Sequence, residues 1–362
     1  MSLQSISNTI HQALTAAGLD PQRGALKGVT QTIRKALAEA GLLQAEPSPR
    51  AERRGSDDIV DVTAREVPTC EQPTREAPQP APAHEQFVTR QYTGPGGSRA
   101  YKLYIPAAHA SRKPMPLIVM LHGCKQNPDD FATGTGMNAL AEQHGVLVAY
   151  PEQTARANGA NCWNWFSTAD QARDGAEPSI IAGIVREITA AEAVDKQRVF
   201  VAGLSAGAAM AVILGTTHPD VFAGVGAHSG LPHGAAHDVA SAFAAMHGGT
   251  RKPGAPLPVP TIVFHGDQDR TVVASNGDAI VTQAVAGQGA PLQKKTTNGR
   301  VSGGTREHVR NVWVDAKGRP RVEQWALHGG THAWSGGSPA GSYTDAQGPD
   351  ASAEMLRFFL AQ

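Results

Sequence analysis

Residues 199–207 read VFVAGLSAG, and small or apolar residues continue to about residue 216. The first four residues predict a buried strand, and the residues after Gly207 predict a helix. Gly203 and Gly207 permit a sharp turn around Ser205, which is the pattern of the G-x-S-x-G nucleophile elbow. The helix that follows would point backbone amides at a developing oxyanion. We therefore expect Ser205 to be a nucleophile; the alternative is a glycine-rich tight turn without a chemical role.

Further apolar runs on both sides of the elbow predict the other strands of one sheet. The run PLIVML at 116–121 is typical of a strand buried on both faces. Helical patterns at 180–193 and 351–360 alternate with such runs, which predicts a mostly parallel α/β sheet with helices on both faces. Alternating segments at 87–92 and 99–105 predict an antiparallel pair joined by a glycine-rich turn. The remaining expected strands are 146–150, 199–202, 223–227, 261–264 and 322–327.

The loop after the expected strand 261–264 carries two carboxylates. Where a serine elbow occurs in an α/β sheet, an acid and then a histidine follow it along the chain. Asp267 lies next to the strand, where capping of the turn is its expected use. Asp269 lies further out, before Val272, which can anchor the loop on the core. We favour Asp269 as the group that orients the base.

The base is expected in the loop after the last strand, where residues 327–337 read LHGGTHAWSGG. His332 lies within this loop, near glycines that allow a close approach to the serine. His328 lies at the strand end, and we expect it to hydrogen-bond the loop backbone. We favour His332 as the base.

The segment LHGCKQ at 121–126 follows the strand that precedes the elbow. In this arrangement one oxyanion donor comes from that loop and the other from the residue after the nucleophile. The backbone N–H groups of Cys124 and Ala206 are therefore the expected oxyanion hole. An ordinary strand-to-helix loop is the alternative.

Aromatic residues gather at CWNWF, residues 162–166. We expect Trp163 and Trp165, together with Trp334 two residues after His332, to line a substrate groove. The alternative is that they pack as a small core within the loop.

The first 86 residues differ from the rest of the chain. Residues 6–19 and 29–42 form an imperfect repeat with apolar residues at helical spacing, which predicts two short amphipathic helices within 1–43. We expect this segment to pack on the main domain, to self-associate or to attach to a polymer granule. Residues 44–86 are rich in proline and poor in apolar residues, which predicts a disordered linker that contains Cys70.

Composition excludes several classes of function. Thirty-two Lys and Arg balance thirty-two Asp and Glu, so no basic field attracts nucleic acid. No apolar run is long enough to span a membrane, and the N-terminus lacks a secretory signal, which predicts a cytoplasmic protein. The histidines do not cluster with carboxylates, so we expect no metal.

Five ordered motifs resemble the poly(3-hydroxybutyrate) depolymerase family of esterases, which is related to feruloyl and acetylxylan esterases. The motifs are LHGCKQ at 121–126, CWNWF at 162–166, GLSAG at 203–207, HSGLP at 228–232 and GTHAWSGG at 330–337. The resemblance covers residues 87–362 and implies an α/β-hydrolase fold and cofactor-free hydrolysis of carboxylic esters by a serine nucleophile. The family's nucleophile, acid and base fall on Ser205, Asp269 and His332.

The resemblance implies a polyhydroxyalkanoate depolymerase-type esterase that acts on short-chain polyesters, their oligomers or small esters. Two alternatives remain: a feruloyl or acetylxylan type of carbohydrate esterase, and a non-catalytic protein that coats polymer granules. The loops of Cys124 and Cys162 should meet near the site. A disulfide there would brace the oxyanion loop, or the two thiols would stay reduced in the cytosol.

Overall fold

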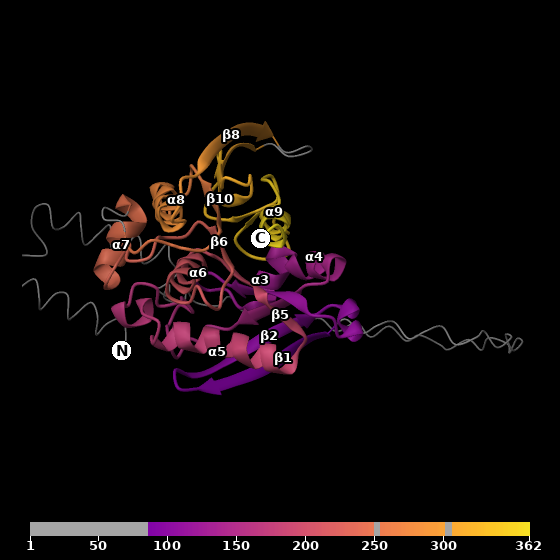
Figure 1. Cartoon of the computed structure of the whole chain (residues 1–362). Helices are drawn as coiled ribbons and strands as arrows, with labels where there is room; N and C mark the ends of the chain where they lie inside the picture. The colour runs from indigo at the N-terminus through magenta and orange to yellow at the C-terminus, as the bar shows by residue number, and fades with distance from the viewer. Residues whose placement is uncertain (1–85, 250–253, 301–305) are drawn as a thin grey trace, which may run out of the picture. The chain divides into compact units, whose positions relative to one another are not determined.

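The computed structural model describes residues 86–249, 254–300 and 306–362 (Figure 1). The helical repeat expected at 1–43 lies outside the described residues, as does the expected linker with Cys70. Gln86 at the end of that linker is the exception, because the first strand begins there.

The described residues form one large sheet whose centre is parallel. Its strand order is β1-β2-β4-β3-β5-β6-β7-β10-β9-β8. The strands from β4 to β10 in that order pair in parallel, and antiparallel pairs flank them on both sides. This confirms the predicted mostly parallel sheet. The strands are β1 (Gln86–Gly94), β2 (Gly97–Ile105), β3 (Met115–Leu121), β4 (Leu147–Pro151), β5 (Val194–Leu204), β6 (Gly224–His228), β7 (Thr261–Gly266), β8 (Gln293–Arg300), β9 (Glu307–Val314) and β10 (Pro320–Leu327).

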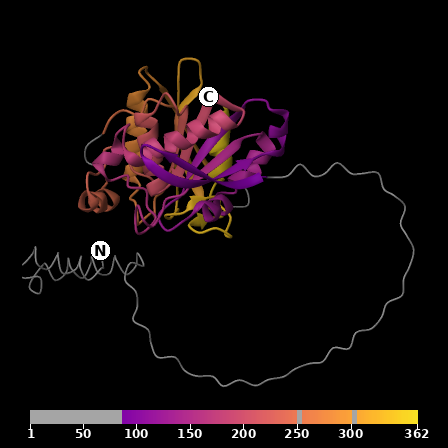
Figure 2. The same ribbon diagram turned by 90° about the horizontal axis from the view of Figure 1, so that it is seen from below.

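Helices cover both faces of the sheet, as Figures 1 and 2 show. Side chains alternate between the faces, so each buried strand contributes to two cores. In β3, Leu117 and Val119 face one core while Ile118 and Met120 face the other. The first core contains α5 (Ala176–Ala191), α6 (Ala206–Thr217), α7 (Val239–Gly248) and α8 (Ser275–Gly287), and the second contains α3 (Pro128–Thr135), α4 (Met137–His144) and α9 (Ala351–Leu360).

Strands β8 and β9 were not expected from the sequence. Strand β8 reads QKKTTNGR and is exposed along almost its whole length, because it lies at the sheet edge and packs under no helix. A strand exposed on both faces has no alternation of apolar and polar residues to reveal it. Its lysines are typical of edge strands that do not pair with other chains.

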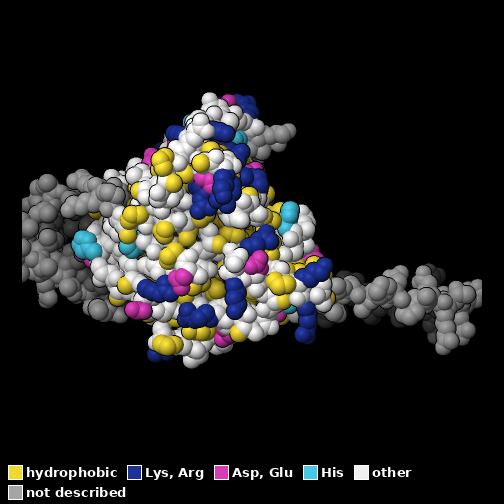
Figure 3. Space-filling model, in the orientation of Figure 1, with side chains coloured by type: hydrophobic (Ala, Val, Ile, Leu, Met, Phe, Trp, Pro, Cys, Tyr) yellow, Lys and Arg dark blue, Asp and Glu magenta, His cyan; other side chains and the backbone are white. Residues whose placement is uncertain are grey.

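The surface mixes charge types. Figure 3 shows Lys and Arg side chains interspersed with Asp, Glu and hydrophobic side chains on one face. Within the described part of the chain, no helix combines the length and the apolar character that a membrane span needs.

The parallel arrangement gathers the ends of the central strands at one edge of the sheet. Strand β3 ends before His122, β5 before Ser205, β7 before Asp267 and β10 before His328, while β6 ends at His228. Ligand sites in open α/β sheets lie beyond the carboxyl ends of the strands. The candidate residues therefore share one edge although they are far apart in sequence.

Candidate active site

Ser205 lies in the turn between β5 and α6 with φ 57° and ψ −118°. A positive φ is strained for a residue with a side chain, and the flanking glycines show why the turn keeps it. A Cβ on Gly203 would lie 2.5 Å from the carbonyl carbon of Gly207, and one on Gly207 would lie 2.0 Å from the carbonyl oxygen of Leu121. Only glycine fits at both positions, so the elbow motif is a steric requirement here.

The loop after β3 approaches the serine. A Cβ built on Gly123 would lie 3.7 Å from Cβ of Ser205. The Gly123 N–H donates to Oε1 of Gln126 at 2.9 Å, and its carbonyl lies 2.8 Å from Nδ1 of His122. Within the residues that the structure describes, the N–H groups of Cys124 and Ala206 donate to no acceptor. Both amides are therefore available to an incoming oxyanion.

The structure brings Asp269 and His332 together, with 2.7 Å between Oδ2 and Nδ1. The other oxygen of Asp269 accepts the N–H groups of Thr271 and Val272, each at 2.9 Å. Burial alone would raise the pKa of Asp269, but the hydrogen bond and charge of His332 and the Val272 amide outweigh it and lower that pKa. The ionised carboxylate holds the proton on Nδ1, which leaves Nε2 of His332 as an acceptor suited to a base.

The second carboxylate of this loop serves another pair. Oδ2 of Asp267 lies 3.0 Å from Nδ1 of His328, and Oδ1 accepts the Gly329 N–H at 2.8 Å. The expectation that His328 bonds the loop backbone is therefore wrong, because the side chain of Asp267 occupies its ring nitrogen. Both side chains are about half exposed, and their pairing ties the acid loop to the loop that carries His332.

His228 connects the turn that carries Ser205 to the loop that carries His332. Among the described residues, no hydrogen bond joins Oγ of Ser205 to Nε2 of His332. Such bonds are often long in substrate-free enzymes and tighten in the complex. The backbone of His228 accepts the Ser205 N–H at 2.9 Å, and its ring accepts the Ser335 N–H at 3.0 Å.

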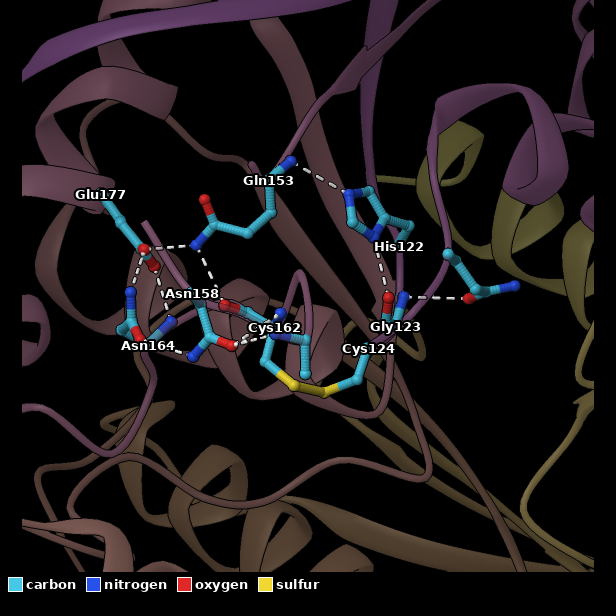
Figure 4. Close-up of a disulfide and its surroundings, with 10 residues drawn as sticks. His122, Gly123, Cys124, Gln153, Asn158, Cys162, Asn164 and Glu177 are labelled. Carbon is cyan, nitrogen blue, oxygen red and sulfur yellow. Dashed lines mark hydrogen bonds between the residues drawn. A yellow bond between two sulfur atoms is a disulfide. The ribbon is translucent and has the colours of Figure 1, made fainter. Parts of the chain in front are cut away.

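Cys124 and Cys162 form a disulfide across 38 residues (Figure 4). It joins the loop after β3 to the irregular segment that follows β4. A backbone bond from Lys125 N–H to the carbonyl of Ala160, at 2.8 Å, runs beside it. The disulfide therefore fixes the loop that carries one of the two candidate oxyanion amides.

A buried polar network, which the sequence did not reveal, supports the same loop. Glu177, in the first turn of α5, accepts the backbone N–H of Asn164 at 2.7 Å and its side-chain amide at 2.6 Å. Gln153 also donates to Glu177, and the Gln153 backbone N–H donates to Nε2 of His122 at 3.0 Å, as Figure 4 shows. Burial raises the pKa of Glu177 against the opposing effect of these donors. No periodicity or motif marks such contacts, because the partners come from separate loops.

The three tryptophans do not line an open groove. Trp163, Trp165 and Trp334 are exposed by 0, 6 and 1%. Trp334 stacks on His228 with 5.2 Å between ring centres and donates its indole N–H to Oγ of Ser352 at 3.0 Å. The expectation of substrate contact through these rings is therefore corrected, because their side chains pack in the interior.

An exposed aromatic residue does lie next to the loop that carries His332. Tyr343 is 44% exposed and has φ 52°. Its carbonyl accepts the Trp334 N–H at 2.7 Å, while Ser342 is bound through its N–H and hydroxyl to Asp130. The sequence reasoning missed Tyr343, because a single tyrosine in a glycine- and serine-rich segment has no pattern around it.

One known protein family matches a large part of this sequence. Residues 99–311 match the family model described as Esterase PHB depolymerase. The chain is 33% identical to a poly(3-hydroxyalkanoate) depolymerase C of Paucimonas lemoignei over 66% of this chain and 59% of that protein. It is 28% identical to a poly(3-hydroxybutyrate) depolymerase of Ralstonia pickettii over 67% and 53%.

The chain thus spans between half and three-fifths of the length of these relatives. Among solved structures, an acetyl xylan esterase from Aspergillus awamori superimposes with a TM-score of 0.59 at 19% identity, over 76% of this chain and all of that one. At that identity the likeness shows the α/β-hydrolase fold alone. The family match covers more than half of the chain and contains the serine elbow, so this chain belongs to the Esterase PHB depolymerase family.

Proposed function

We propose that this chain hydrolyses carboxylic esters through an acyl-enzyme on Ser205, and that its substrates are short-chain polyesters of the poly(3-hydroxybutyrate) type or their oligomers. Asp269 and His332 complete the triad, and the N–H groups of Cys124 and Ala206 form the oxyanion hole. The observation that carries the proposal is the 2.7 Å bond from His332 to the buried Asp269, at the same sheet edge as a strained serine elbow.

In the first half-reaction, Oγ of Ser205 attacks the ester carbonyl carbon while Nε2 of His332 takes the hydroxyl proton. The carbonyl oxygen becomes an oxyanion and accepts the two backbone N–H groups. When the tetrahedral intermediate collapses, the carbon–oxygen bond to the alcohol breaks and His332 gives its proton to the leaving alkoxide.

In the second half-reaction, water attacks the acyl-enzyme and His332 takes its proton. The intermediate expels Ser205, which regains a proton, and the carboxylic acid leaves. Asp269 stays ionised throughout and stabilises the imidazolium that forms in each half. No metal or cofactor takes part in this scheme.

The polyester substrate is supported by the family and by the printed names of the two depolymerases above. The test is a substrate panel with the full chain: 3-hydroxybutyrate oligomers, amorphous polymer, p-nitrophenyl butyrate and methyl ferulate. We expect oligomers to be hydrolysed with a higher kcat/KM than methyl ferulate. Preference for the ferulate would replace the polyester by a plant cell-wall ester, and absence of all turnover together with no labelling of Ser205 by a fluorophosphonate would refute the esterase proposal.

A further inference from the structure

His228 is the last residue of β6, between the serine elbow and the acid loop. Its backbone pairs with Leu204 at the end of β5 and with Phe264 in β7. Its carbonyl accepts the Ser205 N–H at 2.9 Å. The sheet therefore fixes the backbone of His228, and His228 in turn fixes the first amide of the nucleophile turn.

The ring of His228 is locked between two aromatic side chains. It is fully buried, lies nearly parallel to Phe264 at 5.7 Å and stacks on Trp334 at 5.2 Å. Rotation of the imidazole would displace one of these neighbours, which close packing resists. The plane of the imidazole ring is therefore set.

The hydrogen bonds assign one tautomer. The Ser335 N–H lies 3.0 Å from Nε2, and because an amide only donates, Nε2 must be an acceptor. The proton is then on Nδ1, which lies 3.2 Å from Oγ of Ser229. Burial lowers the pKa of His228 to about 3, and the charges of His265 and His332 act in the same direction against the weaker effect of Asp269. The ring is therefore neutral at neutral pH.

The bond to Ser335 places the loop that carries the base. Ser335 is three residues after His332 and belongs to the short strand β11 (Trp334–Ser335). Within the described part of the chain, the backbone N–H and carbonyl of His332 take part in no backbone hydrogen bond. The position of His332 thus depends on its bond to Asp269 and on the anchored residues on either side.

We propose that His228 is a positioning residue that sets the separation of Ser205 and His332. Its carbonyl holds the nucleophile turn, and its imidazole holds the base loop as an acceptor. The inference rests on the proposed function, since it takes these two residues as nucleophile and base. Loss of the acceptor leaves the buried Ser335 N–H without a partner, and the loop must move to satisfy it.

Two substitutions separate the acceptor from the packing. His228→Phe keeps a planar ring between Phe264 and Trp334 but removes the acceptor, whereas His228→Gln supplies a side-chain oxygen in place of Nε2. Small misplacements of catalytic groups cost up to about 100-fold in rate. With p-nitrophenyl butyrate we expect His228→Phe to lower kcat about 10- to 100-fold with KM changed less than about twofold, and His228→Gln to recover much of that loss.

His218→Phe is the matched control, because His218 is also buried but follows α6 at the end opposite Ser205. It should leave kcat unchanged. Ser205→Ala separates the two hypotheses: if it retains turnover, the proposed function fails. If Ser205→Ala has no activity while the kcat of His228→Phe stays within twofold of wild type, only the positioning role fails.

A measurement on the wild-type chain keeps the proposal testable if His228→Phe does not fold. Proton–nitrogen NMR of the imidazoles should show His228 neutral with its proton on Nδ1 from pH 5 to pH 9. A proton on Nε2 of His228, or a charged ring near neutral pH, would overturn the assignment, because neither form can accept the Ser335 N–H.

Discussion

Asp269 divides its two oxygens between two tasks. Oδ1 binds the amides of Thr271 and Val272 and so shapes its own loop, whereas Oδ2 orients His332. The carboxylate is buried, so its charge acts on the imidazole with little screening. A change at this residue is expected to affect both the loop and the base.

Substitution of the three proposed triad members should have graded effects. We expect Ser205→Ala and His332→Ala each to lower kcat for p-nitrophenyl butyrate by at least about 1,000-fold, because both take part in proton transfer and bond formation. Asp269→Asn should cost less, though still orders of magnitude. His328→Ala is the control and should stay near wild type, since His328 binds Asp267 instead. Loss of activity in His328→Ala, together with near-wild-type activity in His332→Ala, would reassign the base to His328.

The lowered pKa of Asp269 predicts how stability depends on pH. A carboxyl group with a lowered folded-state pKa contributes stability that is present above its unfolded value, near 3.8, and lost as the pH falls through the folded value. The difference in free energy of unfolding between wild type and Asp269→Asn should therefore be largest near pH 7 and shrink below about pH 4. Urea unfolding at several pH values measures it. A difference that grows on acidification would contradict the lowered pKa.

At the scale of loops and helices, two separate ties hold the oxyanion loop. One is the Cys124–Cys162 disulfide, and the other runs from Glu177 through Gln153 to His122. The disulfide and the hydrogen-bonded chain come from different elements, but they end two residues apart, at Cys124 and at His122. Either one can limit movement of the Cys124 amide when the other is removed.

We expect Cys162→Ser to lower the free energy of unfolding by about 4 kcal/mol, given the 38-residue separation, but to lower kcat only a few-fold. Glu177→Gln alone should also have a modest effect on kcat. The double variant should lose more than the product of the two single losses, because both ties are then gone. Glu187→Gln, on the same helix but bound to Tyr101, is the matched control. Independent, multiplicative losses would show that the ties do not share a function.

The elements that could be predicted from the sequence are those with an apolar pattern. Strand β3 was placed within one residue, because all seven of its residues are buried. Strand β8 could not be predicted, since almost all its residues are exposed and it has no apolar pattern. The elbow could be predicted because its two glycines form a visible sequence pattern. The pattern exists because a Cβ at either glycine would collide with the backbone of Gly207 or Leu121.

The surroundings of the site could not be predicted in the same way. The bond from Ser335 to His228 joins residues 107 apart, and neither carries a local signal of the other. The tryptophans do have a local signal, but the signal is ambiguous. A high local density of aromatic residues is equally compatible with a substrate groove and with a packed interior. Only the three-dimensional fold decides between these possibilities.

At the scale of the whole molecule, every proposed catalytic residue lies between Gln86 and Gln362. Deletion of residues 1–43 should therefore leave kcat for p-nitrophenyl butyrate unchanged. If that segment serves self-association or granule attachment, the deletion should lower either the mass in light scattering or the fraction that sediments with amorphous polyester. Loss of soluble-ester turnover would place the segment within the catalytic fold and contradict the predicted domain boundary.

The contact between Gln126 and Ser342 has a consequence for biosynthesis. Gln126 binds the N–H of Gly123 beside the proposed oxyanion hole, and it also binds the backbone of Ser342, 216 residues later. On the ribosome, the elbow and most of the sheet emerge before Ser342 has been translated. A nascent chain should therefore stay catalytically inactive until the residues around Ser342 have left the exit tunnel and can contact Gln126.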